Sequence, residues 1–335
     1  MTLRVIHCGT GPVGRAALGG IVNHPDLELV GHYVWSRDKV GLDAGTLCGL
    51  PETGVVATND WSALLELEAA HDVCRFLARG TNAVTVSIFP WAHPGAVPSE
   101  FGEPVRKACE LGGSTALFTG IDPGWGTTDL AIAALACADR VDCVRVQELG
   151  WFGQYTAELV MREYFGFGKP REFEPMLVSG GFLMQMWAPT LRHIADALGI
   201  EIEDWNILYE TGAVDVDTET GFGTVEAGTA AVVHFELQAL SAGTPIAVVE
   251  HADRVARGAG AHWPSPYGPE ELSYRVEIEG DPTYTVELNF SAERAGAKIT
   301  AMPAINAIPH VCAASPGLKS PFDIPRYTTR NARRI

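Results

Sequence analysis

The feature that most constrains the fold is a glycine-rich loop close to the N-terminus. A short apolar run covers residues 3–8, an alanine- and leucine-rich stretch follows, and a second apolar run covers residues 27–34. Between the first run and the Ala/Leu-rich stretch stand Gly9, Thr10, Gly11, Pro12, Val13 and Gly14. A strand, a glycine loop, a helix and a second strand within about 30 residues form the pattern that holds the pyrophosphate of a dinucleotide. The pattern therefore predicts a parallel α/β domain with a dinucleotide site.

Each glycine of this loop has a separate task. Gly9 permits the tight turn, Gly11 lets the backbone approach the pyrophosphate, and Gly14 lets the helix pack close to the strand. The helix N-terminus adds N–H donors and the positive end of its dipole. Because the formal net charge of the chain is −17, the phosphate site has to be built locally from such backbone groups and a few Arg or Ser side chains.

The residues after the second apolar run favour NADP over NAD. An NAD-selective site usually has Asp or Glu here, which accepts hydrogen bonds from the ribose 2′-OH. This chain instead has Trp35, Ser36, Arg37, Asp38 and Lys39. A hydroxyl followed by a guanidinium suits a 2′-phosphate, which requires donors and positive charge. The alternative is that Arg37 is a solvated turn residue that stacks on adenine, and that either cofactor is accepted.

Residues 1–120 alternate strand and helix signals. Strands are predicted at residues 3–8, 27–34, 55–58, 83–87 and 115–119. Helices are predicted at residues 13–23, 61–68, 72–79 and 101–111. This alternation indicates a Rossmann-type, doubly wound parallel sheet, so the fold class is α/β in this part of the chain.

One join in the pattern lacks an expected strand. The helix at 61–68 runs directly into the helix at 72–79, and no β-rich apolar run separates them. Parallel neighbours in a doubly wound sheet require a strand at this point. Either the sheet has dispensed with its fourth strand, or residues are missing between about Ala69 and Asp72. We favour the second explanation.

The second half of the chain has a different texture. Strands are predicted at residues 144–149, 205–209, 230–239, 246–254, 274–279 and 284–289, and helices at 157–165 and 184–198. This pattern indicates an α+β domain with a mostly antiparallel sheet. The apolar stretch 297–312, which we expect Pro303 and Pro309 to break, should return to the first domain.

These patterns predict two domains. The dinucleotide-binding domain covers residues 1–143 and is completed by residues 297–325, and the substrate domain covers residues 144–296. A length of 335 residues agrees with two domains.

Composition excludes several classes of protein. The chain has no basic face for nucleic acid, and no run approaches the roughly 20 apolar residues of a membrane helix. The N-terminus enters a strand without a basic region or cleavage site, so we expect a cytoplasmic protein with no nucleic-acid or membrane partner. The seven cysteines form no CxxC pair and mostly lie in apolar runs, which predicts reduced core thiols and no metal site.

Later motifs resemble one known family. The segment 119–124, Thr-Gly-Ile-Asp-Pro-Gly, resembles the TGxNPG loop of the 2,4-diaminopentanoate dehydrogenase and native amine dehydrogenase group. Tyr155 followed by Phe-Gly-Phe-Gly at 165–168 resembles a second segment of that group. The stretches 306–309 and 311–317 resemble its C-terminal NAIPxVCAAxPG signature.

The resemblance covers nearly the whole chain and carries expectations with it. It implies a dihydrodipicolinate-reductase-like N-terminal domain and a homodimer formed through the second domain. It also adds Asp122, Pro123 and Asn306 to the residues expected to bind the cofactor. The paired-His and DAPSGT motifs of true dihydrodipicolinate reductases are absent, which argues against that activity.

One departure from the family concerns the chemistry. Amine dehydrogenases of the group carry a Glu in a segment like TxEELxYP, where it activates ammonia or water. The corresponding segment 85–94 reads Thr-Val-Ser-Ile-Phe-Pro-Trp-Ala-His-Pro and has no carboxylate. Ser87, His93, Tyr155 and Glu148 are the candidates for the missing proton chemistry, because hydroxyl, imidazole, phenol and carboxyl groups can hold or give a proton. We expect Glu148 to pair with an arginine.

These observations predict an NAD(P)-dependent oxidoreductase. Its expected reaction is hydride transfer to or from a C=N or C=O carbon of a small, fairly apolar amine, imine or carbonyl substrate. Amine dehydrogenase or imine reductase activity and ketone or aldehyde reductase activity both remain open. A nucleotide-binding module without turnover is the alternative from another class, and the missing Glu favours it.

Overall fold

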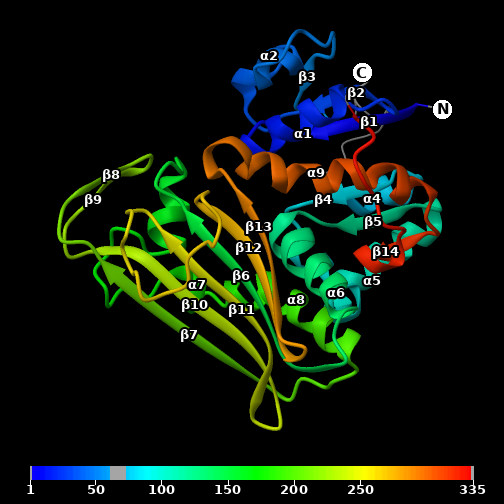
Figure 1. Cartoon of the computed structure of the whole chain (residues 1–335). Coiled ribbons are helices and arrows are strands. Elements are labelled where there is room, and N and C mark those ends of the chain that lie inside the picture. The colour runs from blue at the N-terminus through cyan, green and yellow to red at the C-terminus, as the bar shows by residue number, and fades with distance from the viewer. Residues whose placement is uncertain (1, 61–72, 333–335) are drawn as a thin grey trace. The chain divides into compact units, whose positions relative to one another are not determined.

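The computed structural model describes residues 2–60 and 73–332. The chain divides into two compact units, one formed by residues 1–121 with 297–335 and the other by residues 122–296. The observed boundary follows Ile121 rather than residue 143, so residues 122–143 pack with the second unit. Figure 1 shows the elements of both units along the chain.

The first unit holds two parallel sheets of three strands each, in the orders β1-β2-β3 and β14-β5-β4. Its strands are β1 (Leu3–Cys8), β2 (Leu27–Tyr33), β3 (Ala57–Thr58), β4 (Ala83–Thr85), β5 (Thr115–Phe118) and β14 (Gly317–Lys319). Its helices are α1 (Pro12–Val22), α2 (Ala44–Cys48), α4 (Val73–Leu77) and α5 (Ser99–Gly112). Parallel strands joined through helices agree with the predicted Rossmann-type class.

Details of this unit differ from the prediction. The third strand is shorter than predicted, because only residues 57–58 pair with β2. Among the described residues, β1 pairs only with β2 and β4 pairs only with β5. The predicted helix at 61–68 and the join at 69–72 lie outside the described residues.

Helix α9 (Ala292–Ala313) brings the end of the chain back to the first unit. The prolines at 303 and 309 lie inside this helix and do not break it, contrary to the prediction. Ile305 packs in a buried cluster with Ile21 and Leu27, and Ala307 packs in another cluster with Leu117. The helix therefore contributes to the hydrophobic core beside both sheets of the unit.

The second unit is built on one six-stranded sheet in the order β13-β12-β6-β11-β10-β7. Its strands are β6 (Arg140–Trp151), β7 (Asp204–Ala213), β10 (Ala230–Ser241), β11 (Thr244–Arg254), β12 (Leu272–Asp281) and β13 (Tyr284–Phe290), with a separate hairpin of β8 (Thr218–Thr220) and β9 (Gly223–Val225). Only the β6–β11 pair is parallel. The helices are α6 (Leu130–Leu135), α7 (Met176–Ser179) and α8 (Phe182–Leu198). In place of the predicted helix at 157–165 there is a single π-helical turn, Val160–Tyr164.

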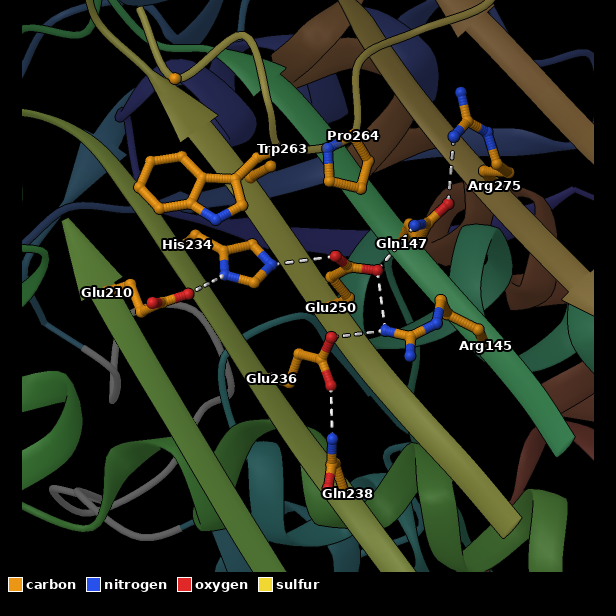
Figure 2. Close-up of polar contacts among 12 residues, drawn as sticks. Arg145, Gln147, Glu210, His234, Glu236, Gln238, Glu250, Trp263, Pro264 and Arg275 are labelled. Atoms are coloured by element: carbon orange, nitrogen blue, oxygen red, sulfur yellow. Dashed lines mark hydrogen bonds and ion pairs between the residues drawn. The ribbon is translucent and has the colours of Figure 1, made fainter. Parts of the chain in front are cut away.

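The two faces of this sheet have different chemistry. One face packs against α8 and forms the largest core, in which Val146, Val249 and Phe235 are fully buried. The other face carries a row of polar side chains (Figure 2). Because neighbouring side chains of a strand point to opposite faces, each strand presents apolar residues to α8 and polar residues to the other side.

Two further expectations have structural outcomes. No helix in the described part of the chain is long and apolar enough to cross a membrane. The cysteines are free, but only Cys109 is fully buried, while Cys8, Cys137 and Cys312 are exposed. The expectation of core thiols is therefore wrong for most of them, because an apolar sequence neighbourhood does not decide which face a side chain takes.

Candidate active site

The glycine loop has the backbone geometry of a pyrophosphate site. Gly9 has a φ of +102°, in the region that glycine adopts without strain. A Cβ on Gly14 would lie 2.8 Å from the carbonyl oxygen of Gly9, whereas a Cβ on Gly11 would meet no atom within 4 Å. Close packing thus requires Gly14, and the space above Gly11 is open. Pro12 begins α1, whose first turn has no acidic residue, so its free N–H groups suit an anion.

Cationic side chains adjoin this loop. Lys39 Nζ donates a hydrogen bond to Thr10 Oγ1 at 2.7 Å, and Arg15 Nε donates one to the carbonyl oxygen of Thr10 at 3.1 Å. Ser36 and Arg37 are exposed in the short turn after β2. Since β1 and β2 are parallel neighbours, their carboxyl ends bring residues 9–14 and 36–39 to the same sheet edge. A hydroxyl and cationic side chains therefore lie at the sheet edge where the glycine loop ends.

Two stacked histidines lie beneath the loop. The Nδ1 atoms of His7 and His32 are 3.1 Å apart, and their rings are within 7° of parallel. His7 Cε1 would lie 3.6 Å from a Cβ on Gly14, which shows how close the pair is to the loop. Burial, together with the neighbouring His32, lowers the pKa of His7 to about 4. The two histidines are therefore uncharged at neutral pH and add no positive charge beside the loop.

The structure places the other predicted site residues in both units. Ser87 follows β4, where its N–H donates to Thr85 Oγ1, and His93 stands between two short turns further along. Asn306 lies on α9 within the first unit. Tyr155 belongs to the second unit and is half exposed. Burial raises the pKa of the Tyr155 phenol, and Glu148 raises it further, so this hydroxyl is within electrostatic reach of Glu148.

Sheet register aligns an unexpected row of side chains in the second unit. Glu148 of β6 stands opposite Tyr274 of β12 on one side and His251 of β11 on the other, and His251 stands opposite Phe235 of β10. The His251 ring stacks on Phe235 with a centroid distance of 4.4 Å. These side chains occupy the face that packs against α8, so titratable groups lie inside the largest core.

Asp122 joins this row from the loop after β5. Its Oδ2 accepts hydrogen bonds from Trp187 Nε1 at 2.9 Å and pairs with His251 Nε2 at 3.1 Å. Its Oδ1 accepts a hydrogen bond from Thr127 Oγ1 at 2.9 Å. Burial opposes ionisation of Asp122, but the bonds from His251 and Trp187 outweigh it and lower its pKa. The predicted cofactor residue Asp122 is therefore a carboxylate with donors on both oxygens.

Glu148 has the opposite protonation preference. It is hydrogen-bonded to Asp122 and to Tyr274. Burial, with Asp122 and Asp253 nearby, raises its pKa well above the usual range, although His251 opposes the shift. Because two hydrogen-bonded carboxyl groups share a proton, Glu148 holds it and Asp122 is ionised. The expectation that Glu148 pairs with an arginine is wrong, since its partners are an acid and a phenol.

His251 and Asp253 complete what we call the buried acid cluster, formed by Asp122, Glu148, His251, Asp253 and Tyr274. Burial disfavours the His251 cation, but Asp122 and Asp253 outweigh burial and raise its pKa well above the usual range. Asp253 lies 3.5 Å from His251 Nδ1 and is completely buried, and burial raises its pKa. Sequence reasoning missed His251, Asp253 and Tyr274. The sequence did contain a signal for them. His251 and Asp253 alternate in step with Val249, and Tyr274 alternates in step with Val276, so the apolar pattern places all three on the core face of the sheet.

The polar row on the opposite face is a second cluster, and its carboxylates Glu236 and Glu250 have hydrogen-bond donors. Arg145 Nη1 bonds Glu236 at 2.7 Å and Glu250 at 2.8 Å, Gln147 donates to Glu250, and His234 Nε2 lies 2.9 Å from Glu250 (Figure 2). Ligand atoms of His234, Glu236 and Glu250 are within 4.8 Å of one another, as a metal site requires. However, the Arg145 guanidinium already bonds both carboxylates, so the geometry favours an ion-pair network over a metal site.

Comparisons with known proteins agree with this geometry. A family model for the C-terminal domain of 2,4-diaminopentanoate dehydrogenase matches residues 128–333. An amine dehydrogenase of Streptomyces virginiae is 32% identical over 95% of this chain and 94% of its own. The 2,4-diaminopentanoate dehydrogenase of Acetoanaerobium sticklandii is 26% identical over 76% of this chain and 70% of its own.

A solved structure shows the same fold. The amine dehydrogenase from Mycobacterium smegmatis superposes with a TM-score of 0.75 at 20% identity, covering 99% of this chain and 98% of that one. The family model matches more than half of the chain and includes the sheet that carries the buried acid cluster. Together with the glycine loop, these matches establish that the chain belongs to the family of 2,4-diaminopentanoate dehydrogenases and amine dehydrogenases, and that it is an NAD(P)-dependent oxidoreductase.

Proposed function

We propose that this protein uses NADPH to reduce a C=O or C=N carbon of a small, fairly apolar substrate, or runs the reverse oxidation. The observation that most supports this function is the sheet edge at which the glycine loop meets Ser36, Arg37 and Lys39. Lys39 already reaches Thr10 of the loop, and the turn after β2 offers a hydroxyl and two cations where an NAD site usually has an acid. When bound, the nicotinamide supplies or accepts the hydride, and the protein positions the substrate and handles the proton.

The relatives support an amine or imine as one partner of the reaction. They are an amine dehydrogenase and a 2,4-diaminopentanoate dehydrogenase. Reductive amination requires a base near neutral pH to deprotonate ammonium. Segment 85–94 has no carboxylate for this role, so we propose that reduction of a carbonyl or a preformed imine outpaces amination with free ammonia. Ser87, His93 and Tyr155 remain our proposed catalytic residues from the sequence.

We also propose a cytoplasmic homodimer, with Asp122, Pro123 and Asn306 near the cofactor and residues 122–296 supplying the substrate pocket and the dimer contact. The family resemblance supports the dimer, and light scattering at micromolar concentration tests it.

A second candidate is a nucleotide-binding module without turnover. The separation of the parallel strands into two sheets among the described residues favours it, because a doubly wound fold is built on one continuous sheet.

The test is NADPH oxidation against a panel of ketones and aldehydes, with and without ammonia. We expect oxidation without ammonia, at a higher rate than any additional ammonia-dependent rate. Oxidation only with ammonia would identify an amine dehydrogenase and contradict the proposed order of rates. Tight NADPH binding with no oxidation of any kind would support the module and overturn the proposed function.

A further inference from the structure

We propose that Glu148, held between Asp122 and Tyr274, is the catalytic acid that protonates the substrate's carbonyl oxygen or imine nitrogen. This inference rests on the proposed function, and it names the proton donor for it. Of the four candidates that the sequence offered, which were Ser87, His93, Tyr155 and Glu148, it selects Glu148 of β6.

The geometry of the buried acid cluster carries the first part of the argument. One oxygen of Asp122, one oxygen of Glu148 and one ring nitrogen of His251 lie within 4.8 Å of one another. Asp122 has protein donors on both of its oxygens, Thr127 on one and Trp187 on the other, and His251 Nε2 forms an ion pair with it. A carboxylate held in this way is a fixed negative charge, and the carboxyl group beside it keeps its proton.

Asp253 gives an independent sign that the cluster is not a purely structural network. It is fully buried, and within the described residues neither of its oxygens has a hydrogen-bond partner. Its nearest cationic neighbour is His251 Nδ1 at 3.5 Å, too long for a good hydrogen bond. An unsatisfied buried carboxyl is costly, and perturbed groups of this kind gather where chemistry needs them. In the Arg145 network on the opposite face, the carboxylates Glu236 and Glu250 have donors, and the atom without a hydrogen-bond partner is His234 Nδ1.

Chain connectivity places Asp122 directly after a strand of the first unit. Asp122 follows Phe118, the last residue of β5, by only four positions. Ligands of parallel α/β sheets bind outside the carboxyl ends of the strands. The loop that leaves this edge therefore carries Asp122, and with it the hydrogen bond to Glu148.

The proposed step balances as follows. Hydride adds to the carbonyl carbon, the C=O π electrons move to the oxygen, and the nicotinamide is oxidised. The O–H bond of the Glu148 carboxyl breaks, its proton bonds to the substrate oxygen, and Glu148 becomes a carboxylate. With a preformed imine the same proton goes to nitrogen. Solvent then returns a proton to Glu148.

The surroundings of Glu148 set the direction of its pH dependence. The titratable groups that face it are Asp122, His251, Asp253, Tyr274 and Tyr155. Burial and the two aspartates raise the pKa of Glu148 well above the usual range, which favours its neutral form. A neutral carboxyl acts as an acid rather than a base, which agrees with carbonyl reduction outpacing ammonium activation. Reduction should therefore slow as pH rises through the pKa of Glu148.

The test compares Glu148→Gln and Tyr274→Phe with the exposed control Glu201→Gln. We expect Glu148→Gln to lose about 100-fold or more in kcat, the lower end of general acid catalysis, with NADPH affinity and melting temperature little changed. Tyr274→Phe should shift the high-pH limb of the rate profile, and Glu148→Asp should restore part of the rate. The control should match the unaltered protein.

A second readout needs no turnover. Infrared difference spectra of the cofactor-free protein at pH 7 should show a protonated carboxyl band that disappears in Glu148→Gln and persists in Glu201→Gln. The inference is overturned if Glu148→Gln keeps full turnover and an unchanged pH profile, or if its infrared band is the same as that of the unaltered protein. An unaltered protein that binds NADPH tightly but oxidises it with none of the substrates would instead overturn the proposed function, and this inference with it.

Discussion

At the level of single residues, Arg37 should decide between the two nicotinamide cofactors. Its guanidinium is exposed in the turn after β2, beside Ser36, at the edge where the glycine loop ends. A charge-assisted hydrogen bond is worth about 1.5–3 kcal/mol. We therefore predict that Arg37→Ala weakens NADPH binding by about tenfold or more and NADH binding far less, as measured by calorimetric titration with each cofactor.

The matched control is Arg79→Ala, which removes an exposed arginine elsewhere in the first unit. It should leave both affinities unchanged. Equal losses for NADPH and NADH in Arg37→Ala would mean that Arg37 stacks on adenine instead of binding a 2′-phosphate.

The same scale shows what the sequence could and could not predict. The loop 9–14 was predictable because its constraints are local: a positive φ at Gly9 and a close backbone contact at Gly14 demand glycine wherever the motif occurs. The buried acid cluster was not, because its members come from positions 122, 148, 251, 253 and 274 and meet only through sheet register. The sequence indicated an arginine as the partner of Glu148, and its actual neighbours across the strands follow only from the register.

At the level of elements, the polar row on β6, β10 and β11 should make the second unit sensitive to acid. Hydrogen bonds from His234 and Gln147 and the charge of Arg145 outweigh burial and lower the pKa of Glu250 to about 2. A carboxylate whose folded pKa is depressed stabilises the fold above its unfolded pKa of about 4.5, and this stabilisation is lost as pH falls through the folded value. The shift corresponds to a stabilisation on the order of 3 kcal/mol.

We therefore predict that the free energy of unfolding declines between about pH 5 and pH 2, and that Glu250→Gln is less stable at pH 7 with a flatter decline. Urea unfolding at a series of pH values measures both slopes. The exposed Glu201→Gln serves again as control and should follow the unaltered curve. Parallel curves for Glu250→Gln and the unaltered protein would show that Glu250 is not ionised through this network.

The presence of most helices and strands was predicted better than their boundaries and their pairing partners. Most strands of both units appear at the predicted positions, because alternating or continuous apolar runs are strong signals. The wrong details concern helices: α9 continues through Pro303 and Pro309, and residues 157–165 form only a short turn. Packing against two clusters of the first unit holds α9 together where proline alone would predict a break.

At the level of the whole molecule, the two compact units should respond separately to cofactor. Ile305 of α9 is buried with Ile21 and Leu27, and truncating a buried Ile costs about 2–5 kcal/mol. NADPH at about 100 times its Kd adds roughly 2.7 kcal/mol to the unit that binds it. We predict that Ile305→Ala lowers, and NADPH raises, the same calorimetric transition.

The transition of residues 122–296 should move much less in both cases. Leu237→Ala, a fully buried position of the other unit, is the matched variant and should lower the transition that NADPH does not raise. If NADPH raises the transition that Leu237→Ala lowers, the cofactor binds chiefly to the second unit and the assignment of the glycine loop fails.

The central claim is that this chain transfers hydride between a nicotinamide and a small carbonyl or imine substrate. The most direct measurement is mass spectrometry of the product after incubation with NADPH deuterated at C4, using the carbonyl panel with and without ammonia. The account predicts one deuterium on the former carbonyl or imine carbon of the product, formed without ammonia and lost together with turnover in Glu148→Gln. Tight NADPH binding with no deuterium in any product would contradict it and leave a nucleotide-binding module.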